Sequence, residues 1–274
     1  MTTQTSKRTA IDYFARHPVF THAEFLSAHA AGNRRSTHTA NNILAHHLAA
    51  GRLVRVRRGL FAAVPRGVEP KAAAVDPYLV ATKLSDDAVV AYHAALQFHG
   101  KAYSVSNRFT YLTRHRARAF HYRQAEFVPV QFAASLRELA DAGGGIREER
   151  HAGGVVRVTT LERTLVDVFD APEHGGGWEE IWRSLESVEF FDLEAVVVYA
   201  LKLGSALTVA RVGFFLEQHR EPLMVEEHHL EALRAHAPGQ PRYLDRRREP
   251  GKLVSRWNLV VPEHVLSRAW AEVP

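Results

Sequence analysis

The stretch that predicts the fold of this chain runs from Thr21 to Val64 and reads THAEFLSAHAAGNRRSTHTANNILAHHLAAGRLVRVRRGLFAAV. Thr21 followed by Glu24 has the spacing of a capping box, which predicts the start of a helix. The Gly-Asn pair at residues 32–33 tolerates left-handed backbone and is predicted to end that helix. Ser36 is a good N-cap for a second helix.

A pair of β-prone segments follows this second helix, which Gly51 is predicted to end. The segments LVRVRR and LFAAV lie on either side of Gly59, whose backbone freedom suits a tight hairpin turn. A first helix, Lys7–Arg16, is predicted before them. Helices, turn and hairpin in this order are the layout of a winged helix-turn-helix.

The second helix of the motif is predicted to be a DNA-recognition helix. Its apolar side chains fall on one face, and the opposite face carries short polar residues in the first two turns, where a recognition helix touches base edges. Asparagine can pair with adenine and threonine can contact the thymine methyl group. Arginines before the helix and in the hairpin would meet phosphates. The predicted DNA-binding residues are Arg34, Arg35, Ser36, Thr37, His38, Asn41, Asn42, Arg52, Arg55, Arg57 and Arg58.

Charge is unevenly distributed along the sequence. Residues 1–68 contain ten Lys or Arg against two acidic residues, a net of +8, and subtracting this from the +5 of the whole chain leaves −3 for the remainder. A basic N-terminal segment followed by a slightly acidic remainder indicates that the N-terminal segment binds a polyanion. On this count the N-terminal segment is the only basic part of the molecule.

The chain has 274 residues, which is too long for one winged-helix module of roughly 60 to 90 residues. Pro65, Gly67 and Pro70 mark a linker. We therefore expect a winged helix-turn-helix DNA-binding domain at residues 1–68, a linker at 69–75 and a larger mixed α+β domain at 76–274. The predicted fold class of the whole chain is α+β.

Hydrophobic periodicity predicts the elements of the larger domain. The predicted helices are Asp76–Leu84, Val89–His99, a helix that opens at Thr159, and helices around Trp178–Leu185, Asp192–Leu203, Leu207–Gln218 and Val225–Ala235. The predicted strands are Phe109–Thr113, His121–Phe132, Val155–Val158 and Val254–Val261.

The composition narrows the class of protein. The sequence contains no cysteine, which removes disulfides, thiolate zinc sites and cysteine nucleophiles and is compatible with a reducing cytoplasm. The first residues lack the apolar core of a secretory signal. The longest apolar run, around Ala195–Leu203, is far shorter than the roughly 20 residues that span a bilayer. We expect a cytoplasmic protein without membrane contact.

No motif in the larger domain predicts catalysis, a cofactor or a metal ion. The sequence HGGG at residues 174–177 copies the oxyanion loop of some esterases, but the chain has no G-x-S-x-G nucleophile motif. Arg163 and Asp167 are four residues apart on one predicted helix and can pair. The adjacent His46 and His47 diverge on a helix by roughly 100°. We therefore expect His47 to be partly buried and His46 exposed, with no shared metal.

Five segments of the chain carry a resemblance to a known family. They are Gly51–Phe61 (GRLVRVRRGLF), Ala91–Gly100 (AYHAALQFHG), Thr159–Asp167 (TTLERTLVD), Arg211–Leu216 (RVGFFL) and Trp257–Pro262 (WNLVVP). In this order they resemble the AbiEi-type antitoxins, predicted transcriptional regulators of phage-defence and type IV toxin–antitoxin loci. The similarity runs from about Ile11 to Pro262.

The resemblance implies an antitoxin that binds double-stranded DNA in its own promoter region and represses its own operon. It also implies a nucleotidyltransferase-like toxin, encoded beside the antitoxin and opposed by it without the need for a stable complex. The resemblance brings no catalytic residues to this chain, so an enzyme is not expected.

Other functions stay open at this stage. A nucleic-acid-directed enzyme, such as a metal-dependent nuclease, would use the winged helix for substrate delivery and would depend on acidic residues such as Glu162 and Asp167. A stand-alone transcriptional regulator would keep the DNA-binding role without a toxin. A winged helix can also serve as a protein-interaction module.

Overall fold

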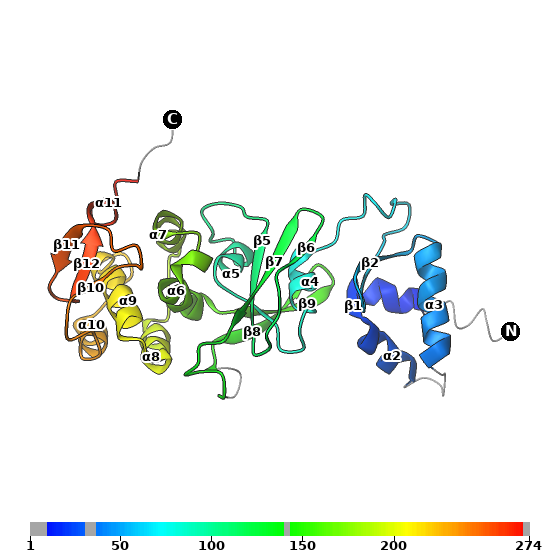
Figure 1. The fold of residues 1–274 in the computed structure, drawn as a ribbon, viewed down its shortest axis with the longest axis horizontal. Coiled ribbons are helices and arrows are strands. Elements are labelled where there is room, and N and C mark those ends of the chain that lie inside the picture. Colours follow the sequence, from blue (N-terminus) through cyan, green and yellow to red (C-terminus); the bar gives the residue numbers. More distant parts are fainter. Residues whose placement is uncertain (1–9, 31–36, 140–142, 271–274) are drawn as a thin grey trace.

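The computed structural model describes residues 10–30, 37–139 and 143–270 of the chain. Within these ranges the protein is a mixed α+β structure with three separate sheets, so the predicted α+β class is confirmed. The sheets follow one another along the longest axis of the molecule, with the N-terminal sheet at one end and the last sheet at the other (Figure 1).

The N-terminal segment, residues 10–63, surrounds a small antiparallel sheet. Its elements are a helix over residues 10–16, β1 (Val19–Thr21), α2 (His22–Ala30), α3 (Thr37–Ala49), β2 (Leu53–Arg57) and β3 (Leu60–Ala63). The strand order is β1-β3-β2. Aromatic rings from the helices and the sheet, among them Phe14, Phe20 and Phe25, fill the space between them.

The predicted helix boundaries in this segment have clear physical causes. Thr21 Oγ1 accepts a hydrogen bond from the Glu24 backbone N–H (3.2 Å), and Glu24 Oε2 accepts one from the Thr21 N–H (2.7 Å). This capping box satisfies donors that the first turn of α2 leaves without an intrahelical acceptor. Gly51 follows α3 with φ of 67°, a conformation that is costly for a residue with a Cβ.

The central sheet is mixed and has the strand order β6-β7-β5-β4-β9-β8. Two of its pairs, β5–β7 and β4–β9, are parallel. The elements of this region are α4 (Pro77–Ala81), β4 (Val89–Val90), α5 (His93–Phe98), β5 (Arg108–Thr113), β6 (Phe120–Tyr122), β7 (Ala125–Gln131), β8 (Ile146–His151) and β9 (Gly154–Thr159).

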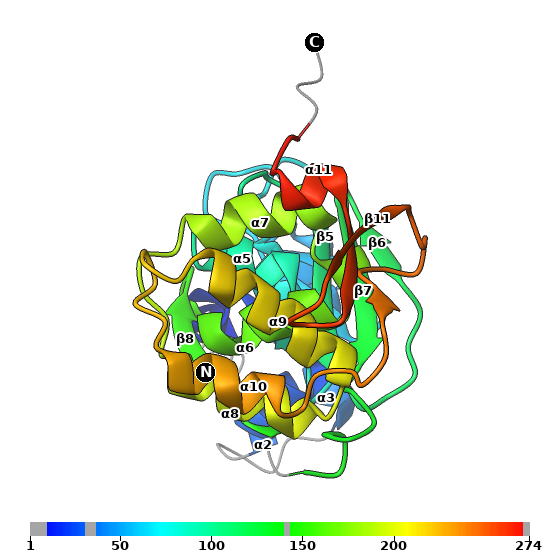
Figure 2. The ribbon, with the colours of Figure 1, turned by 90° about the vertical axis from the view of Figure 1, so that its left-hand side faces the viewer.

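A helical layer and a third sheet complete the described chain. Figure 2 shows α9, α10 and β11 in front, with the central sheet behind them. The largest hydrophobic cluster of the protein lies in this half and includes the buried rings of Trp182 and Trp257. The elements are α6 (Leu161–Asp170), η2 (Pro172–His174), α7 (Trp178–Glu186), α8 (Leu193–Leu203), α9 (Ala206–Gln218), α10 (Glu227–Arg234), β10 (Arg242–Tyr243), β11 (Gly251–Val254), β12 (Leu259–Pro262) and α11 (Glu263–Leu266).

The N-terminal hairpin packs directly on the central region. Val56 and Leu60 belong to the same buried hydrophobic cluster as Leu79 and Val80 of α4. Lys83, just after α4, forms an ion pair with Glu24 of α2. Apolar burial of the hairpin and this ion pair of α2 therefore hold the N-terminal segment against the rest of the protein.

Three predicted elements are wrong because a turn divides each of them. The segment predicted as a helix at Val89–His99 is the strand β4 followed by α5, and the strands predicted at His121–Phe132 and Val254–Val261 are the hairpins β6–β7 and β11–β12. Tyr92, Arg123 and Asn258 lie at these turns with φ of 58°, 54° and 49°. Tyrosine and arginine rarely adopt positive φ, so the sequence did not signal the turns at Tyr92 and Arg123; asparagine tolerates positive φ better, but a single Asn258 is a weak turn signal.

Two other helix starts differ little from the prediction. Asp76 caps α4 and Pro77 is its first residue, as predicted, although the helix ends at Ala81 rather than Leu84. The N-cap of α6 is Thr160 rather than Thr159. None of the described helices combines the length and the hydrophobicity needed to cross a lipid bilayer.

Replacing Gly213 with alanine tests the packing of α9 against the last sheet. A methyl group at Gly213 would lie 2.2 Å from two carbons of the Trp257 ring. Since Trp257 is fully buried, we expect this overpacking to lower the free energy of unfolding by about 1–3 kcal/mol in urea denaturation. A methyl group at Gly239 meets no atom within 4 Å, so Gly239→Ala should change stability by less than about 0.5 kcal/mol. Equal losses in the two variants would contradict this packing.

Candidate nucleic-acid interface

One face of α3 is exposed and polar. Thr37, His38, Asn41 and Asn42 are all exposed, while the opposite face buries Ala40, Leu44 and His47. In Figure 1, α3 lies at the end of the molecule opposite to the third sheet. The predicted residues Arg34, Arg35 and Ser36 lie outside the described residues.

His47 explains how α3 is held in this orientation. Its side chain is fully buried and its ring contacts the edge of Phe14, with 4.9 Å between ring centroids. His46 is exposed, as predicted, whereas His47 is buried fully rather than partly. The buried ring rotates the polar residues of the first two turns toward solvent.

The polar face of α3 is connected to the hairpin turn through α2. His22 is the first residue of α2. Its ring Nε2 lies 2.6 Å from Asn41 Oδ1, and its backbone N–H donates to Gly59 O at 2.8 Å. Asn42 Nδ2 lies 3.3 Å from His38 Nδ1 on the same face. Asn41 therefore keeps its Nδ2 donor for a base, whereas a bidentate contact with adenine first requires the contact with His22 to open.

The hairpin arginines are all exposed, but one of them, Arg57, also contacts the central region. Arg52 Nη1 lies 3.4 Å from His47 Nδ1, and the Arg55 guanidinium lies 5.9 Å from the centre of the Phe61 ring. Arg58 is exposed in the turn and has no hydrogen bond or ion pair with the described residues. It remains available to a phosphate group.

Arg57 does not share this position. Its Nη2 donates to the Leu84 carbonyl at 2.6 Å, and its guanidinium lies 5.9 Å from the centre of the Phe120 ring. The sequence prediction placed both Arg57 and Arg58 at a free hairpin tip. The structure instead uses the Arg57 guanidinium to attach the hairpin to the central region, because a charged group at this contact needs a polar acceptor.

Glu24 is a partly exposed anion within this basic segment. Burial opposes its ionisation, but the hydrogen bonds from Lys83 and from the Thr21 N–H, together with the Lys83 charge, hold the pKa of Glu24 below its ordinary value. The carboxylate charge is thus matched by the charge of Lys83.

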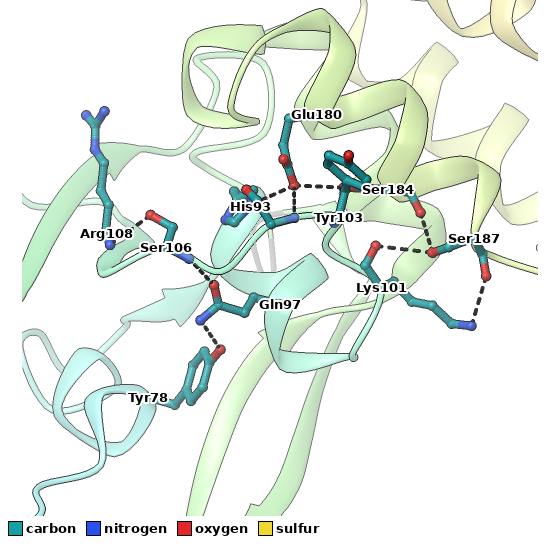
Figure 3. A network of polar contacts seen from close by, with 11 residues as sticks. Tyr78, His93, Gln97, Lys101, Tyr103, Ser106, Arg108, Glu180, Ser184 and Ser187 are labelled. Carbon is teal, nitrogen blue, oxygen red and sulfur yellow. Dashed lines mark hydrogen bonds and ion pairs between the residues drawn. The ribbon is translucent and has the colours of Figure 1, made fainter. Parts of the chain in front are cut away.

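A second polar cluster lies between the central sheet and α7 (Figure 3). Glu180 Oε1 accepts hydrogen bonds from the Ser104 backbone N–H (2.9 Å) and from Ser184 Oγ (3.1 Å), and it lies 3.0 Å from His93 Nε2. Burial by itself would raise the pKa of Glu180, but these donors hold it below its ordinary value. The arrangement ties the loop after α5 to α7.

The glycines of the HGGG sequence belong to this cluster. A Cβ at Gly176 would lie 2.6 Å from Glu180 Cγ, and Gly176 and Gly177 have φ of 91° and 93°. Gly176 thus allows the chain to approach Glu180 closely at the start of α7, whereas a Cβ at Gly177 would meet no atom within 4 Å. An adjoining cavity of about 150 Å³ is lined by His93, Ser104, Ser106, Arg108, Thr110, Glu173, His174, Gly176 and Glu180.

Arg163 and Asp167 form the predicted i, i+4 pair and are buried in α6. Arg163 Nε lies 3.2 Å from Asp167 Oδ2, and the Tyr199 hydroxyl donates to Asp167 Oδ1 at 2.8 Å. Burial raises the pKa of Asp167, and the charge of Arg163 opposes that rise. Glu162 Oε1 accepts from the Asp192 N–H at 3.4 Å. The two acidic residues on which a nuclease would depend therefore have separate structural contacts.

Two groups of histidine and acidic residues in the described chain are close enough to suggest metal ligation. In the group formed by Glu194, His228 and His229, His229 Nδ1 accepts the Glu226 backbone N–H (3.1 Å), which places the ring proton on Nε2, facing Glu194 at 3.3 Å. This tautomer offers no Nε2 lone pair to a metal.

In the second group, formed by Asp86, Asp87 and His115, the carboxylate of Asp87 is already used. It accepts hydrogen bonds from the Ser85 and Thr113 hydroxyls and from the Arg114 backbone N–H, each at 2.6 Å. These bonds fix the turn before β4 against the end of β5.

The comparisons with known proteins show similarity of fold. The sequence matches no protein-family model and no curated protein. Among solved structures, the fold is similar to the crystal structure of the RV2827C protein from Mycobacterium tuberculosis, with a TM-score of 0.55 and 18% sequence identity over 95% of this chain and 92% of that chain. The similarity thus extends over nearly the whole length of both chains.

Glu180→Gln tests the polar cluster around α7 through its pH dependence. The folded-state pKa of Glu180 is below the ordinary 4.5, so its ionised form stabilises the fold in full above about pH 4.5, and this stabilisation is lost as pH falls through the folded-state pKa. At pH 7 we expect the variant to be less stable by about 1–3 kcal/mol, and the difference should shrink below pH 4.5.

The control is Glu189→Gln, the same substitution at an exposed position, which should change stability by less than about 0.5 kcal/mol at every pH. The free energy of unfolding of the three proteins is measured by urea denaturation at several pH values between about 7 and about 3.5, so that the series includes the pH at which carboxylates titrate. A difference between Glu180→Gln and the unmodified protein that is independent of pH would contradict the role given to the ionised carboxylate.

Proposed function

We propose that residues 10–63 form a winged helix-turn-helix that binds double-stranded DNA, with α3 in the major groove and the hairpin turn against the phosphate backbone. The observation that carries this proposal is the exposed polar face of α3, at one end of the molecule (Figure 1), together with the exposed Arg58 in the hairpin turn. A helix in the major groove reads bases with short polar side chains of its first turns.

The order of the elements supports this assignment. A helix, β1, α2, α3 and the β2–β3 hairpin follow one another, and β1 pairs with β3 to close the sheet. The contacts of His22 with Gly59 and Asn41 place the hairpin turn, the start of α2 and the face of α3 next to one another. One duplex could therefore meet the helix and the turn together.

We further propose that this DNA-binding protein is an antitoxin and the autorepressor of a toxin–antitoxin operon, acting in the cytoplasm on its own promoter region. This role rests on the resemblance of the chain to the AbiEi-type antitoxins. Its opponent would be a nucleotidyltransferase-like toxin encoded beside it, and a stable complex of the two proteins is not required.

Two substitutions separate general affinity from sequence preference. Arg58→Ala should weaken binding to every duplex and lower the slope of log K against log salt by about 1, because one phosphate contact is lost. Asn41→Ala should instead change the ranking of sequences, by about 1–3 kcal/mol at one base pair. Gel-shift titrations against a fragment of the gene's own promoter and against a shuffled fragment measure both effects.

The matched control for these titrations is Arg242→Ala, which removes one exposed positive charge at the other end of the molecule. It should leave binding unchanged. If Arg58→Ala and Asn41→Ala bind every fragment as the unmodified protein does, the N-terminal segment is not the DNA-binding element. Absence of any salt-dependent binding would favour a protein-interaction module.

The antitoxin role has its own test in the neighbouring gene. Expression of an adjacent nucleotidyltransferase-like protein alone should arrest growth, and co-expression of this chain should restore it. The Asn41→Ala variant, altered only in the N-terminal segment, should still restore growth if the larger region opposes the toxin. Growth arrest that this chain does not relieve would leave a stand-alone regulator.

A further inference from the structure

We infer that the segment joining β5 to β6, residues 114–119, is a second DNA-binding element that contacts the phosphate backbone beside the groove occupied by α3. The inference rests on the proposed DNA-binding function and extends it from the N-terminal segment to the central region. Arg116 and Arg118 are the residues that make the contact.

The segment is locally basic even though its surroundings are not. Residues 114–123 read RHRARAFHYR and contain four arginines, two histidines and no acidic residue. The net charge of −3 for everything after residue 68 concealed this cluster, so the expectation that the N-terminal segment is the only basic part is wrong. Averaging charge over a long sequence removes a patch of this size.

Two of the four arginines hold the fold together. Arg114 Nε and Nη2 donate to the carbonyls of Arg137 (2.9 Å) and Leu139 (3.0 Å). The Arg123 guanidinium donates to the carbonyls of Ala73 and Pro70, which attaches the linker to the hairpin β6–β7. Each of these guanidinium groups therefore serves the fold by donating hydrogen bonds to backbone carbonyls.

Arg116 and Arg118 make no such contacts with the described residues. Both are exposed, and within the described ranges neither makes a hydrogen bond or an ion pair. They alternate with Ala117 and Ala119, so no bulky neighbour covers them. Two like charges held close together on a short loop repel one another, and a polyanion is the partner that relieves this repulsion.

Contacts in the structure connect this loop to the DNA-binding face. Phe120, at the end of the loop, lies under the Arg57 guanidinium. Arg57 precedes the exposed Arg58, and Gly59 bonds to His22, which in turn contacts Asn41 of α3. The loop, the hairpin turn and the polar face of α3 therefore follow one another across the protein.

The acidic groups near the loop, the hairpin turn and the polar face of α3 are few, and most of them are paired. Asp87 points inward to its three donors, and Glu24 is paired with Lys83. Asp86 is exposed and lies 3.2 Å from His115 Nε2. Glu126, on β7, lies 3.7 Å from His121 and 3.8 Å from Arg108. The guanidinium groups of Arg58, Arg116 and Arg118 are therefore not cancelled by a facing carboxylate.

A contact outside the recognition helix makes binding depend on the length of the duplex. A duplex carries one negative charge per ~1.7 Å of its axis, and each neutralised phosphate contributes about 0.9 to the salt slope. A fragment of about one helical turn reaches only α3 and the hairpin turn. A longer fragment continues past the turn and reaches the β5–β6 loop as well.

The test compares the double variant Arg116→Ala/Arg118→Ala with Arg242→Ala/Arg246→Ala. The second pair removes the same charge from exposed positions at the opposite end of the molecule. The probes are fluorescein-labelled duplexes of random sequence, of about 12 and about 40 base pairs (roughly one and four helical turns), titrated by fluorescence anisotropy at several KCl concentrations.

We expect Arg116→Ala/Arg118→Ala to weaken binding of the long duplex by about 10-fold at 100 mM KCl, and to lower its salt slope by about 2. Binding of the short duplex should be unchanged, and Arg116→Lys/Arg118→Lys should bind both duplexes as the unmodified protein does, because phosphate contact needs charge alone. The control pair should match the unmodified protein on both probes.

The possible failures are distinguishable. If the unmodified protein binds neither duplex, the proposed function is wrong. If it binds both and Arg58→Ala weakens that binding, but the two double variants behave alike on the long duplex, the loop is not a DNA-binding element. Loss of binding to the short duplex in Arg116→Ala/Arg118→Ala would also overturn the inference, since that fragment does not reach the loop.

Discussion

The packing of the β2–β3 hairpin against α4 decides which surfaces of this protein can meet a partner. Val56 and Leu60 share a buried cluster with Leu79 and Val80, and this burial covers the face of the hairpin that carries these two side chains. With one side of the N-terminal sheet covered by the central region, α3 is left at the outer end (Figure 1). The same packing brings Arg57 to the Leu84 carbonyl and leaves Arg58 in solvent.

Polar contacts add to the buried packing of α3 in preorganising the DNA-binding face proposed here. His22 links Asn41 to the hairpin turn, so the side chain that could read a base is held before DNA arrives. Holding it limits the side-chain entropy lost on binding. A bidentate contact of Asn41 with adenine would have to replace the contact between Asn41 and His22. The His22 ring therefore affects which base Asn41 prefers.

The central and C-terminal regions hold several ionisable groups whose arrangement is structural. Asp167 is satisfied by Arg163 and Tyr199, and Glu180 by His93 and its neighbouring donors. Buried charges of this kind persist only when nearly every lone pair has a donor. The HGGG sequence, which resembles a catalytic loop, also has a structural explanation. Gly176 allows the chain to approach Glu180 closely.

Local chemistry in the sequence determined the capping box at Thr21, the end of α3 at Gly51, the inward turn of His47 and the Arg163–Asp167 pair, because each depends on residues within a few positions of one another. Only the tertiary structure decided the rest. Positive φ at Tyr92 and Arg123 is imposed by tertiary structure on residues without intrinsic preference for it, whereas Asn258 tolerates it more readily. The division between Arg57 and Arg58, and between Arg114 and Arg116, depends on carbonyl groups that are remote in sequence, so the order of residues alone shows where arginines are, but not which of them are free.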